Sequence, residues 1–421
     1  MSPALLALAV LGGVAILYAT EWLPLWLSAL IGCVLMVLLG AADFSTVFRG
    51  FSDPVVFLVG GMMVVGEALF ATGAAHDIGQ RLVWLAKGKE RALVILSVLA
   101  AAGLSAFLNN TGTTAIFIPI IGGIAAASLG KIRAKNILMF VAFAANTGGM
   151  LTLVGSTPPL LVQAALTNAG YRPFGFFEFA LLGLPILGLL LFYIVVFGYP
   201  LAQRRFASKS FSLSYASAQE NTPSALKKIA SVLVLLLCVG LFASEAIPLA
   251  LTAVLGAVLV LLFRCVSPRE LFQRFDWNTV LLLGGALGIA NALDKSGAGR
   301  LVADFGLRIL GEEFTPWAFL AMVTGVTMVL TQFMSNTATV AMLAPIVLSM
   351  AEGFGISPHP FMMALATAGA AAYATPVGTP PNSLVLVAGY RFRDYVVFGG
   401  LFILFAYLLI VFLAPVFWPF G

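Results

Sequence analysis

The stretch Leu104–Pro119, LSAFLNNTGTTAIFIP, decides how this chain folds, together with a second stretch that echoes it, Val329–Pro345, VLTQFMSNTATVAMLAP. Each is an apolar run that is interrupted near its middle by amide and hydroxyl side chains and then resumes as a second apolar run ending in proline. The interrupting residues are Asn109, Asn110 and Thr111 in the first stretch, and Ser335, Asn336 and Thr337 in the second. Two matching breaks indicate one site that is built twice.

The composition is that of a polytopic membrane protein. Of 421 residues, 61% are hydrophobic and 9% are charged, and the mean hydropathy is +1.06, whereas about a quarter of the residues in soluble domains are charged. Besides the two interrupted stretches, ten apolar runs have roughly the 17 to 25 residues that a helix needs to cross a bilayer. The N-terminal run lacks the positively charged start of a secretory signal, so we expect an uncleaved first span.

Few side chains in the sequence could carry metal or covalent chemistry. Three cysteines lie singly in apolar sequence and only two histidines are present, which argues against a disulfide framework and against a transition-metal cluster. Paired intramembrane aspartates, a Ser–His pair and an HExxH motif are missing from the sequence, so an intramembrane enzyme is disfavoured. The net charge of +5 is spread over short loops, which fits membrane topology better than a nucleic-acid partner.

An internal repeat sets the architecture. At an offset of 224 residues, YATEWLPLWLSALIGCVL (Tyr18–Leu35) aligns with FASEAIPLALTAVLGAVL (Phe242–Leu259), and Glu21 falls opposite Glu245. At an offset of 226, the residues Asn110, Thr111 and Pro119 align with Asn336, Thr337 and Pro345. Glycines, prolines and polar breaks recur in the same order, which indicates a duplication. We interpret the glycine pairs that begin at Gly60 and Gly284 as points of close helix packing.

The repeat predicts that the two halves have opposite orientations in the membrane. Each half has five spans, and its interrupted stretch adds either zero or two crossings, so the count is odd in both cases. The predicted units are residues 1–202, a cytoplasmic connector over 203–226, and residues 227–421. Seventeen of the 22 basic residues then lie in loops on the side of the connector, which places both termini outside an inner, plasma-type membrane.

Four points along the chain read as breaks within spans. They are the two Asn-Thr clusters, GSTPP (Gly155–Pro159) and GTPPN (Gly378–Asn382). Non-helical backbone at membrane depth is tolerated only where it is buried in protein or lines a wet cavity. The N-termini of such half-helices suit an anion, while unwound carbonyls with Asn, Ser and Thr oxygens suit sodium. The expected fold is therefore an all-α polytopic membrane protein of two inverted five-helix repeats, each with a re-entrant helical hairpin and a broken helix. The sequence does not decide whether the two interrupted stretches are re-entrant or cross the membrane completely.

Each polar feature has a simpler structural interpretation. A single Asn or Thr in a membrane helix often makes only an interhelical hydrogen bond, but four breaks related in pairs favour a site. Glu67 lies well inside a predicted span, where an acid is by default a candidate proton relay. Its repeat partner is Asn291 and it lies toward the basic end of its span, so we favour an interfacial structural role. The amphipathic segments 78–86 and 301–310 are expected to be interfacial helices.

These motifs resemble those of the divalent anion/sodium symporter family, within the wider ion transporter superfamily that also holds citrate-type and arsenite carriers. The resemblance covers essentially the whole chain, and SNTAT (335–339) and TPVGTPPN (375–382) are its most specific parts. It implies a homodimer in which a transport domain moves like an elevator against a fixed scaffold. It also implies that no cofactor is needed beyond Na+ as the coupling ion.

The resemblance also implies roles for particular residues. The residues that would contact the substrate are Asn109, Asn110, Thr111, Ser156, Thr157, Ser335, Asn336, Thr337, Thr379 and Pro380. One sodium ion would be held by Ser105, Asn109, Asn110 and the backbone at Gly155. The second would be held by Thr331, the backbone at Met334, Asn336 and the backbone at Gly378.

Because of two departures from the family pattern, the resemblance does not decide which anion is transported. The first hairpin reads Asn-Asn-Thr where dicarboxylate carriers have Ser-Asn-Thr, and the first TPP break ends in Leu160 where its mate has Asn382. The sequence thus predicts sodium-coupled symport of a small divalent anion, a C4-dicarboxylate or sulfate. The alternative is a proton-coupled or antiporting carrier of the same fold, for arsenite, citrate or another organic acid.

Overall fold

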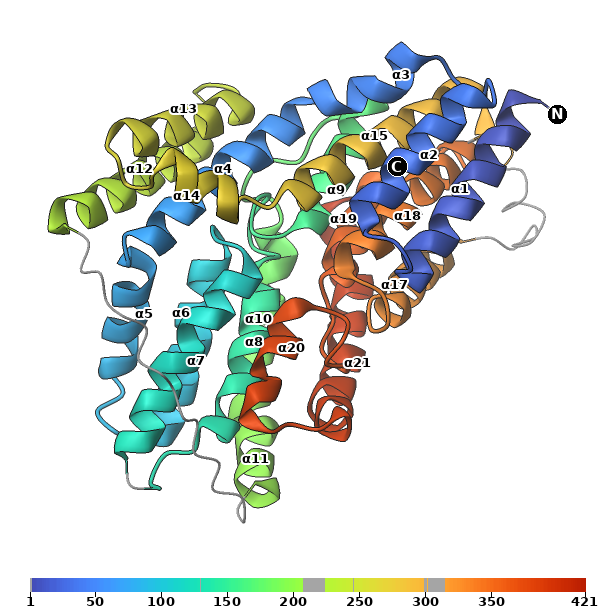
Figure 1. Cartoon of the computed structure of the whole chain (residues 1–421). Helices are drawn as coiled ribbons and strands as arrows, with labels where there is room; N and C mark the ends of the chain where they lie inside the picture. Colours follow the sequence, from blue (N-terminus) through green and yellow to red (C-terminus); the bar gives the residue numbers. More distant parts are fainter. Residues whose placement is uncertain (1, 129, 207–223, 245, 299–300, 302–314) are drawn as a thin grey trace.

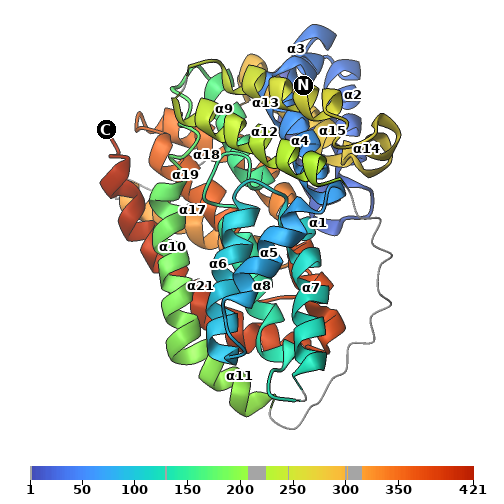
Figure 2. The ribbon, with the colours of Figure 1, turned by 90° about the vertical axis from the view of Figure 1, so that its left-hand side faces the viewer.

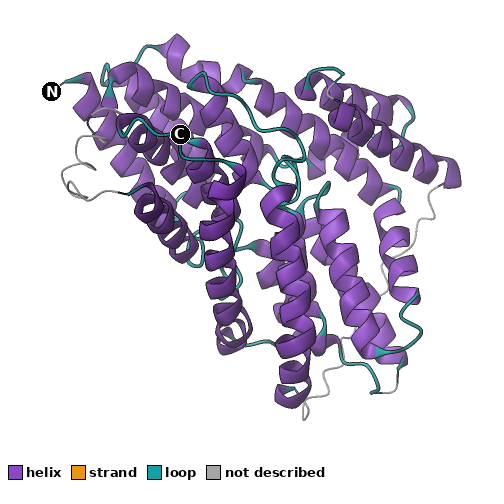
Figure 3. Ribbon diagram, turned by 180° about the vertical axis from the view of Figure 1, so that it is seen from behind, coloured by secondary structure: helices purple, strands orange, loops and turns teal. Residues whose placement is uncertain are grey.

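The computed structural model describes residues 2–128, 130–206, 224–244, 246–298, 301 and 315–421. Within these ranges every regular element is a helix (Figure 3). Six helical stretches are long and apolar enough to cross a membrane: Pro3–Thr20, Phe44–Ala71, Asn110–Ala127, Ala180–Arg205, Ala225–Ser244 and Phe392–Phe417. Three shorter apolar helices accompany them: Leu25–Leu38, Leu249–Leu262 and Pro316–Leu330. The all-α, multi-span class expected from the sequence is confirmed.

The helices follow one another in the same order in both halves of the chain. The first half contains α1 (Pro3–Thr20), α2 (Leu25–Leu38), α3 (Phe44–Phe48) with η1 (Arg49–Ser52), α4 (Pro54–Ala71), α5 (Ala74–Trp84), α6 (Glu90–Ser105), α7 (Asn110–Ala127), η2 (Ala134–Asn136), α8 (Leu138–Gly148), α9 (Thr157–Asn168), α10 (Ala180–Tyr193), η3 (Ile194–Gly198) and α11 (Tyr199–Arg205). The second half contains α12 (Ala225–Ser244), α13 (Leu249–Leu262), α14 (Pro268–Arg274), α15 (Trp277–Ser296), α17 (Pro316–Leu330), α18 (Asn336–Gly353), α19 (His359–Gly369), α20 (Pro380–Leu384), η4 (Val385–Ala388) and α21 (Phe392–Phe417).

Helices of one half pack on helices of the other in a reciprocal way. Helix α4 packs on α13, and α15 packs on α2. A Cβ atom added at Gly61 would lie 2.5 Å from the backbone of Ala253, and one added at Gly285 would lie 2.8 Å from the Ala29 side chain. These two pairs are related by the same offset of 224 residues. The close packing expected at the glycine pairs is therefore present, while the inverted orientation and the unit boundaries stay predictions.

The long helices α4 and α15 form an arm that carries α12 and α13 at one end and α1 and α2 at the other (Figure 1). Most of the other helices lie on one side of this arm, with α10 and α21 side by side (Figure 2). Both interrupted stretches and both broken helices lie where this group meets the arm. The architecture therefore brings the four sequence breaks to one region.

The predicted breaks are confirmed as interruptions of helical structure. Helix α6 ends at Ser105 and α7 starts at Asn110, while α17 ends at Leu330 and α18 starts at Asn336. The spans that contain GSTPP and GTPPN are divided into α8 and α9, and into α19 and α20. Helix α5 lies over the first predicted amphipathic segment. The second segment, apart from residue 301, and residues 207–223 of the connector lie outside the described residues.

Candidate functional site

Both polar clusters are capped helix starts at the tips of the two interrupted stretches. The Asn109 side chain accepts a hydrogen bond of 2.6 Å from the backbone N–H of Gly112. At the second tip, the Ser335 hydroxyl accepts one of 3.2 Å from Ala338. Asn and Ser are favoured at this position because their oxygens satisfy an N–H group that the helix itself leaves free.

The amide of Asn110 lies against the first broken helix. One end of it is within hydrogen-bond distance of three oxygens: Ser105 Oγ at 2.5 Å, the Ala145 carbonyl at 3.1 Å and the Gly155 carbonyl at 3.2 Å. If that end is Nδ2, the amide donates to these oxygens and braces the break. If it is Oδ1, this oxygen and the three others form a group of four, and the only proton available for a hydrogen bond among them is that of the Ser105 hydroxyl. Such a group of oxygens suits a hard cation as its ligands.

Asn336 repeats this arrangement at the second tip. One end of its amide lies near the oxygens of the matching residues: Thr331 Oγ1 at 2.7 Å, the Gly369 carbonyl at 3.1 Å and the Gly378 carbonyl at 3.3 Å. The Thr331 hydroxyl also donates to the Gly369 carbonyl over 2.7 Å. The structure therefore holds two similar groups, one in each half, in which three oxygens surround one end of an asparagine amide.

Six of the residues that the resemblance assigns to sodium fall in these two groups, and two lie elsewhere. The Asn109 amide caps α7 instead. Met334 is buried, and its backbone N–H donates to the Leu330 carbonyl. Sequence reasoning missed Ala145 and Gly369, because they contribute backbone carbonyls and their side chains carry no signal.

Glycines allow the breaks to approach the tips. A Cβ atom added at Gly149 would lie 2.6 Å from the Asn110 amide, and one added at Gly155 would lie 2.9 Å from Gly149 Cα. At the second break, a Cβ atom at Gly378 would lie 2.5 Å from the Thr331 carbonyl oxygen. Because any side chain at these positions would displace a group of the site, the contact between tip and break requires glycine.

Buried polar side chains tie the breaks to the tips and to each other. The Thr152 hydroxyl donates to the Ala106 carbonyl, and the Thr375 hydroxyl donates to the Gln332 carbonyl. These four residues hold each break against the end of its own hairpin helix.

Asn146 and Asn382, both fully buried, join the two broken helices. Asn146 Nδ2 donates to the Ala372 carbonyl at 3.3 Å and to Asn382 Oδ1 at 3.4 Å. Asn382 Nδ2 donates to the carbonyls of Ala372 at 2.9 Å and Thr375 at 2.8 Å. At the position of the second departure, Asn382 is thus part of a structural brace, whereas its mate Leu160 lines the cavity.

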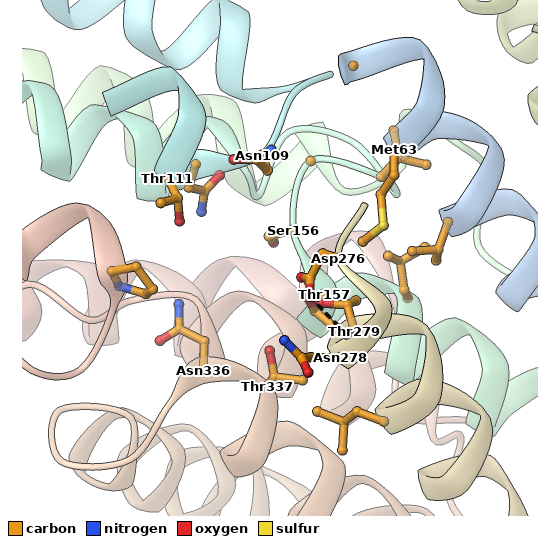
Figure 4. Close-up of a pocket in the computed structure, with 18 of the residues that line it drawn as sticks. Met63, Asn109, Thr111, Ser156, Thr157, Asp276, Asn278, Thr279, Asn336 and Thr337 are labelled. Carbon is orange, nitrogen blue, oxygen red and sulfur yellow. Dashed lines mark hydrogen bonds between the residues drawn. The ribbon is translucent and has the colours of Figure 1, made fainter. Parts of the chain in front are cut away.

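The tips and breaks line one cavity of about 750 Å³. In Figure 4, Asn109 and Thr111 lie across it from Asn336 and Thr337, with Ser156 and Thr157 between them. Its lining includes every residue that the resemblance assigns to the substrate: Asn109, Asn110, Thr111, Ser156, Thr157, Ser335, Asn336, Thr337, Thr379 and Pro380. Substrate contact by these residues stays a proposal, but all of them line the same cavity.

Residues of the arm form the opposite wall, and sequence reasoning missed most of them. The Asp276 carboxylate caps α15 by accepting from the Thr279 backbone and hydroxyl, and Asn278 lies near Thr337 (Figure 4). These letters read as an ordinary helix start, so the sequence alone gave no reason to single them out.

Glu67 of α4 also lies on this wall, where Arg274 of α14 donates to it at 3.0 Å. This ion pair fits the structural role favoured for Glu67. It joins residues that are 207 positions apart, across the packing of the two halves.

A second cavity of about 720 Å³ lies where the C-terminal part of α15 meets α9 and α18. Its lining includes Asn168, Asp294, Ser349 and Glu352. Helix α15 therefore has a cavity at each end, and roughly 20 Å of helix separates Thr279 in the first from Asp294 in the second.

Glu21, at the end of α1, contacts the second tip directly. Its carboxylate accepts a hydrogen bond of 3.1 Å from the Ser335 backbone N–H. Its backbone has φ of 48°, the left-handed conformation that non-glycine residues rarely adopt. Its repeat mate Glu245 lies outside the described residues.

Comparisons with known proteins place this architecture among transporters. The family model described as citrate transporter (CitMHS) matches residues 15–242 and 239–421. A protein of Escherichia coli (strain K12), named uncharacterized transporter YfbS, is 23% identical over 98% of this chain and 99% of its own length. The sodium-dependent dicarboxylate transporter SdcS of Staphylococcus saprophyticus is 23% identical over 89% of this chain and 78% of its own.

The crystal structure of the YdaH transporter of Alcanivorax borkumensis shares the fold, with a TM-score of 0.66 at 18% identity over the full length of both chains. The resemblance to divalent anion/sodium symporters is confirmed by the family match and by relatives named sodium-dependent dicarboxylate transporters. The chain belongs to the citrate transporter family of membrane transport proteins.

Proposed function

We propose that this protein is a secondary active transporter that couples sodium to the symport of a small divalent anion, a C4-dicarboxylate or sulfate. The observation that carries the proposal is the pair of oxygen groups around Asn110 and Asn336, set at two helix starts on the wall of one cavity. Family membership and the names of the relatives support a transported anion. The proposed setting is a multi-pass homodimer in an inner membrane with both termini outside.

Each oxygen group is proposed to hold one Na+ ion. A hydroxyl, an amide oxygen and two carbonyls are hard, neutral donors, which suit sodium better than a softer metal. Bound ions would add positive charge next to the N-termini of α7 and α18, whose free N–H groups and helix dipoles also favour an anion. The ions would thus offset the repulsion that the Glu67 and Asp276 carboxylates exert on a dianion.

The two cavities along α15 support an elevator movement. The tips are next to the N-terminal part of α15 in this conformation, and the second cavity lies at its other end. Moving the tips from one end to the other would carry the site roughly 20 Å along α15. We therefore assign α4 and α15 to the fixed scaffold, and the hairpins and broken helices to the moving part.

Uptake into liposomes tests the proposal. Purified protein is expected to accumulate radiolabelled succinate or sulfate when a sodium gradient is present, and to lose this uptake when choline replaces sodium. Either anion should raise the melting temperature more in sodium than in choline. A protein that takes up neither anion under a sodium gradient would overturn the proposal.

The alternative is a proton-coupled or antiporting carrier of the same fold, and the position of Glu67 on the cavity wall favours it. If Glu67 carries the coupling proton, Glu67→Gln abolishes transport and Asn336→Ala has a smaller effect. Under the sodium proposal the order is reversed, so the two substitutions, assayed together, decide between the carriers.

A further inference from the structure

Arg274, the last residue of α14, is one of the residues that line the cavity. Its side chain is 58% exposed, whereas that of its partner Glu67 is 16% exposed. The Glu67 carboxylate is thus mostly buried, and the Arg274 side chain is the more accessible partner on the lining of the cavity. The two atoms joined, Arg274 Nη1 and Glu67 Oε1, are 3.0 Å apart.

The guanidinium has unused binding capacity. It carries five N–H donors in a planar fork, the ion pair uses one of them, and no second hydrogen bond of this side chain is found within the described part of the chain. A planar fork matches a carboxylate or another oxyanion in a bidentate way. A substrate anion could therefore bind the N–H groups that Glu67 leaves free, while the Glu67 carboxylate still offsets part of the charge of the guanidinium.

The charges of the cavity also single out this residue. Among the described residues of the lining, Arg274 carries the positive charge, and Glu67 and Asp276 carry negative charges. Asp276 is engaged with Thr279 as the cap of α15. Arg274 is thus the group on the arm that can attract the part of a dianion that does not reach the hairpin tips.

We propose that Arg274 binds the outer anionic group of the substrate while the inner group lies at the tips, and that Glu67 competes with the substrate for the guanidinium. This inference rests on the proposed function and adds a residue that selects dianions over monoanions. A purely structural ion pair makes a different prediction, because losing either partner would then disturb the wall in the same way. The direction in which Glu67→Gln changes the KM for the dianions separates the two roles.

The experiment compares the wild-type protein with Arg274→Gln, Arg274→Lys and Glu67→Gln in sodium-driven uptake into liposomes. The probes are succinate and sulfate as dianions and monomethyl succinate as a monoanion. Arg269→Gln is the matched control, since Arg269 is an exposed arginine of the same short helix. The melting temperature of each variant without substrate is the check on folding.

Arg274→Gln is expected to raise the KM for the dianions about tenfold, the size of a lost charged hydrogen bond, with little change for the monoanion. Arg274→Lys should keep part of the affinity because it keeps the charge and loses the fork. Glu67→Gln is expected to lower the KM for the dianions, and Arg269→Gln to leave it unchanged.

Each other outcome has a definite meaning. A wild-type protein that transports neither dianion overturns the proposed function. If the wild-type protein transports a dianion, and Arg274→Gln has the same KM for it as Arg269→Gln, the proposed role of Arg274 is wrong while the proposed function stands. If Glu67→Gln and Arg274→Gln both raise the KM, the pair is structural and the inference is wrong. Should Arg274→Gln fail to fold, Glu67→Gln decides, because an unchanged or higher KM contradicts competition for the guanidinium.

Discussion

The two hairpin tips reach the same backbone geometry with different residues. At the first, the larger cap Asn109 bonds to Gly112, where an added Cβ atom would lie 2.9 Å from the cap oxygen and 2.6 Å from the Phe70 ring. At the second, the smaller cap Ser335 bonds to Ala338, which already has a Cβ atom. The large cap Asn109 is paired with a glycine, and the small cap Ser335 is paired with an alanine. The two halves therefore have the same tip geometry although both members of the pair differ.

The largest expected effect tests whether the two tips are functionally equal. Asn110→Ala and Asn336→Ala are each expected to lower sodium-dependent uptake by at least about 100-fold, because each removes a proposed sodium ligand, and even outer-shell changes at ion sites cost 10- to 100-fold. Uptake and sodium-dependent melting temperatures measure the effect. If one of the two variants transports normally, the two tips are not functionally equivalent.

Replacing Asn110 or Asn336 with aspartate shows which end of each amide faces the surrounding oxygens. If Oδ1 faces them, Asn110→Asp and Asn336→Asp keep an oxygen for the ion, and sodium still raises the melting temperature. If Nδ2 faces them, each variant sets a carboxylate against carbonyl oxygens and is destabilised in sodium and choline alike.

The next effect concerns the residue that the cap contacts. Gly112→Ala is expected to lower the free energy of unfolding by about 1–3 kcal/mol, as over-packing does. Ala338→Gly should cost only about 1 kcal/mol, through helix propensity. Adding Asn109→Ser to Gly112→Ala removes one of the two collisions and should recover part of the loss. Thermal unfolding in detergent measures all three variants, and a neutral Gly112→Ala would contradict the pairing of cap and glycine.

Removing the caps gives a smaller effect. Asn109→Ala and Ser335→Ala should each lower the free energy of unfolding by about 1 kcal/mol. The first should cost more, because its hydrogen bond is 2.6 Å long and the second is 3.2 Å long. Melting temperatures check the order, and equal or reversed losses would show that cap geometry does not set the difference between the tips.

The smallest effect concerns the contact that α1 makes with the second tip. Glu21→Gln keeps an acceptor for the Ser335 N–H but removes its charge, so the free energy of unfolding should fall by about 0.5–1 kcal/mol. Glu245→Gln, at the repeat mate, is the matched comparison. The melting temperatures of both variants measure the effect, and an unchanged Glu21→Gln protein would mean that the contact with Ser335 does not stabilise this conformation.

The sequence located the breaks because polar residues, glycine and proline inside apolar runs have few structural explanations at membrane depth. That signal found the residues of both tips and both breaks that line the cavity. It could not find the opposite wall, because Arg274 and Asn278 reach the cavity only through the packing of α4 on α13 and of α15 on α2. Nor could it find Ala145 or Gly369, whose contribution is a carbonyl that every residue has.

The lengths of two helices were overestimated from hydropathy. Helices α2 and α13 have 14 residues each, although the apolar runs that contain them are longer. Leu39 and Phe263, which follow the two helices, are apolar residues outside them. A hydropathy count includes such residues, since apolar letters do not mark where the backbone stops being helical.

The bonds of Asn146 and Asn382 have a consequence for loading and release. They link the two broken helices through fully buried side chains, and leaving such buried amides without partners costs several kcal/mol. Any displacement that spares these bonds must shift both halves of the pocket together and open them to the same compartment at the same time. A protein joined in this way would keep its two hairpin tips facing one shared solvent space throughout such a displacement.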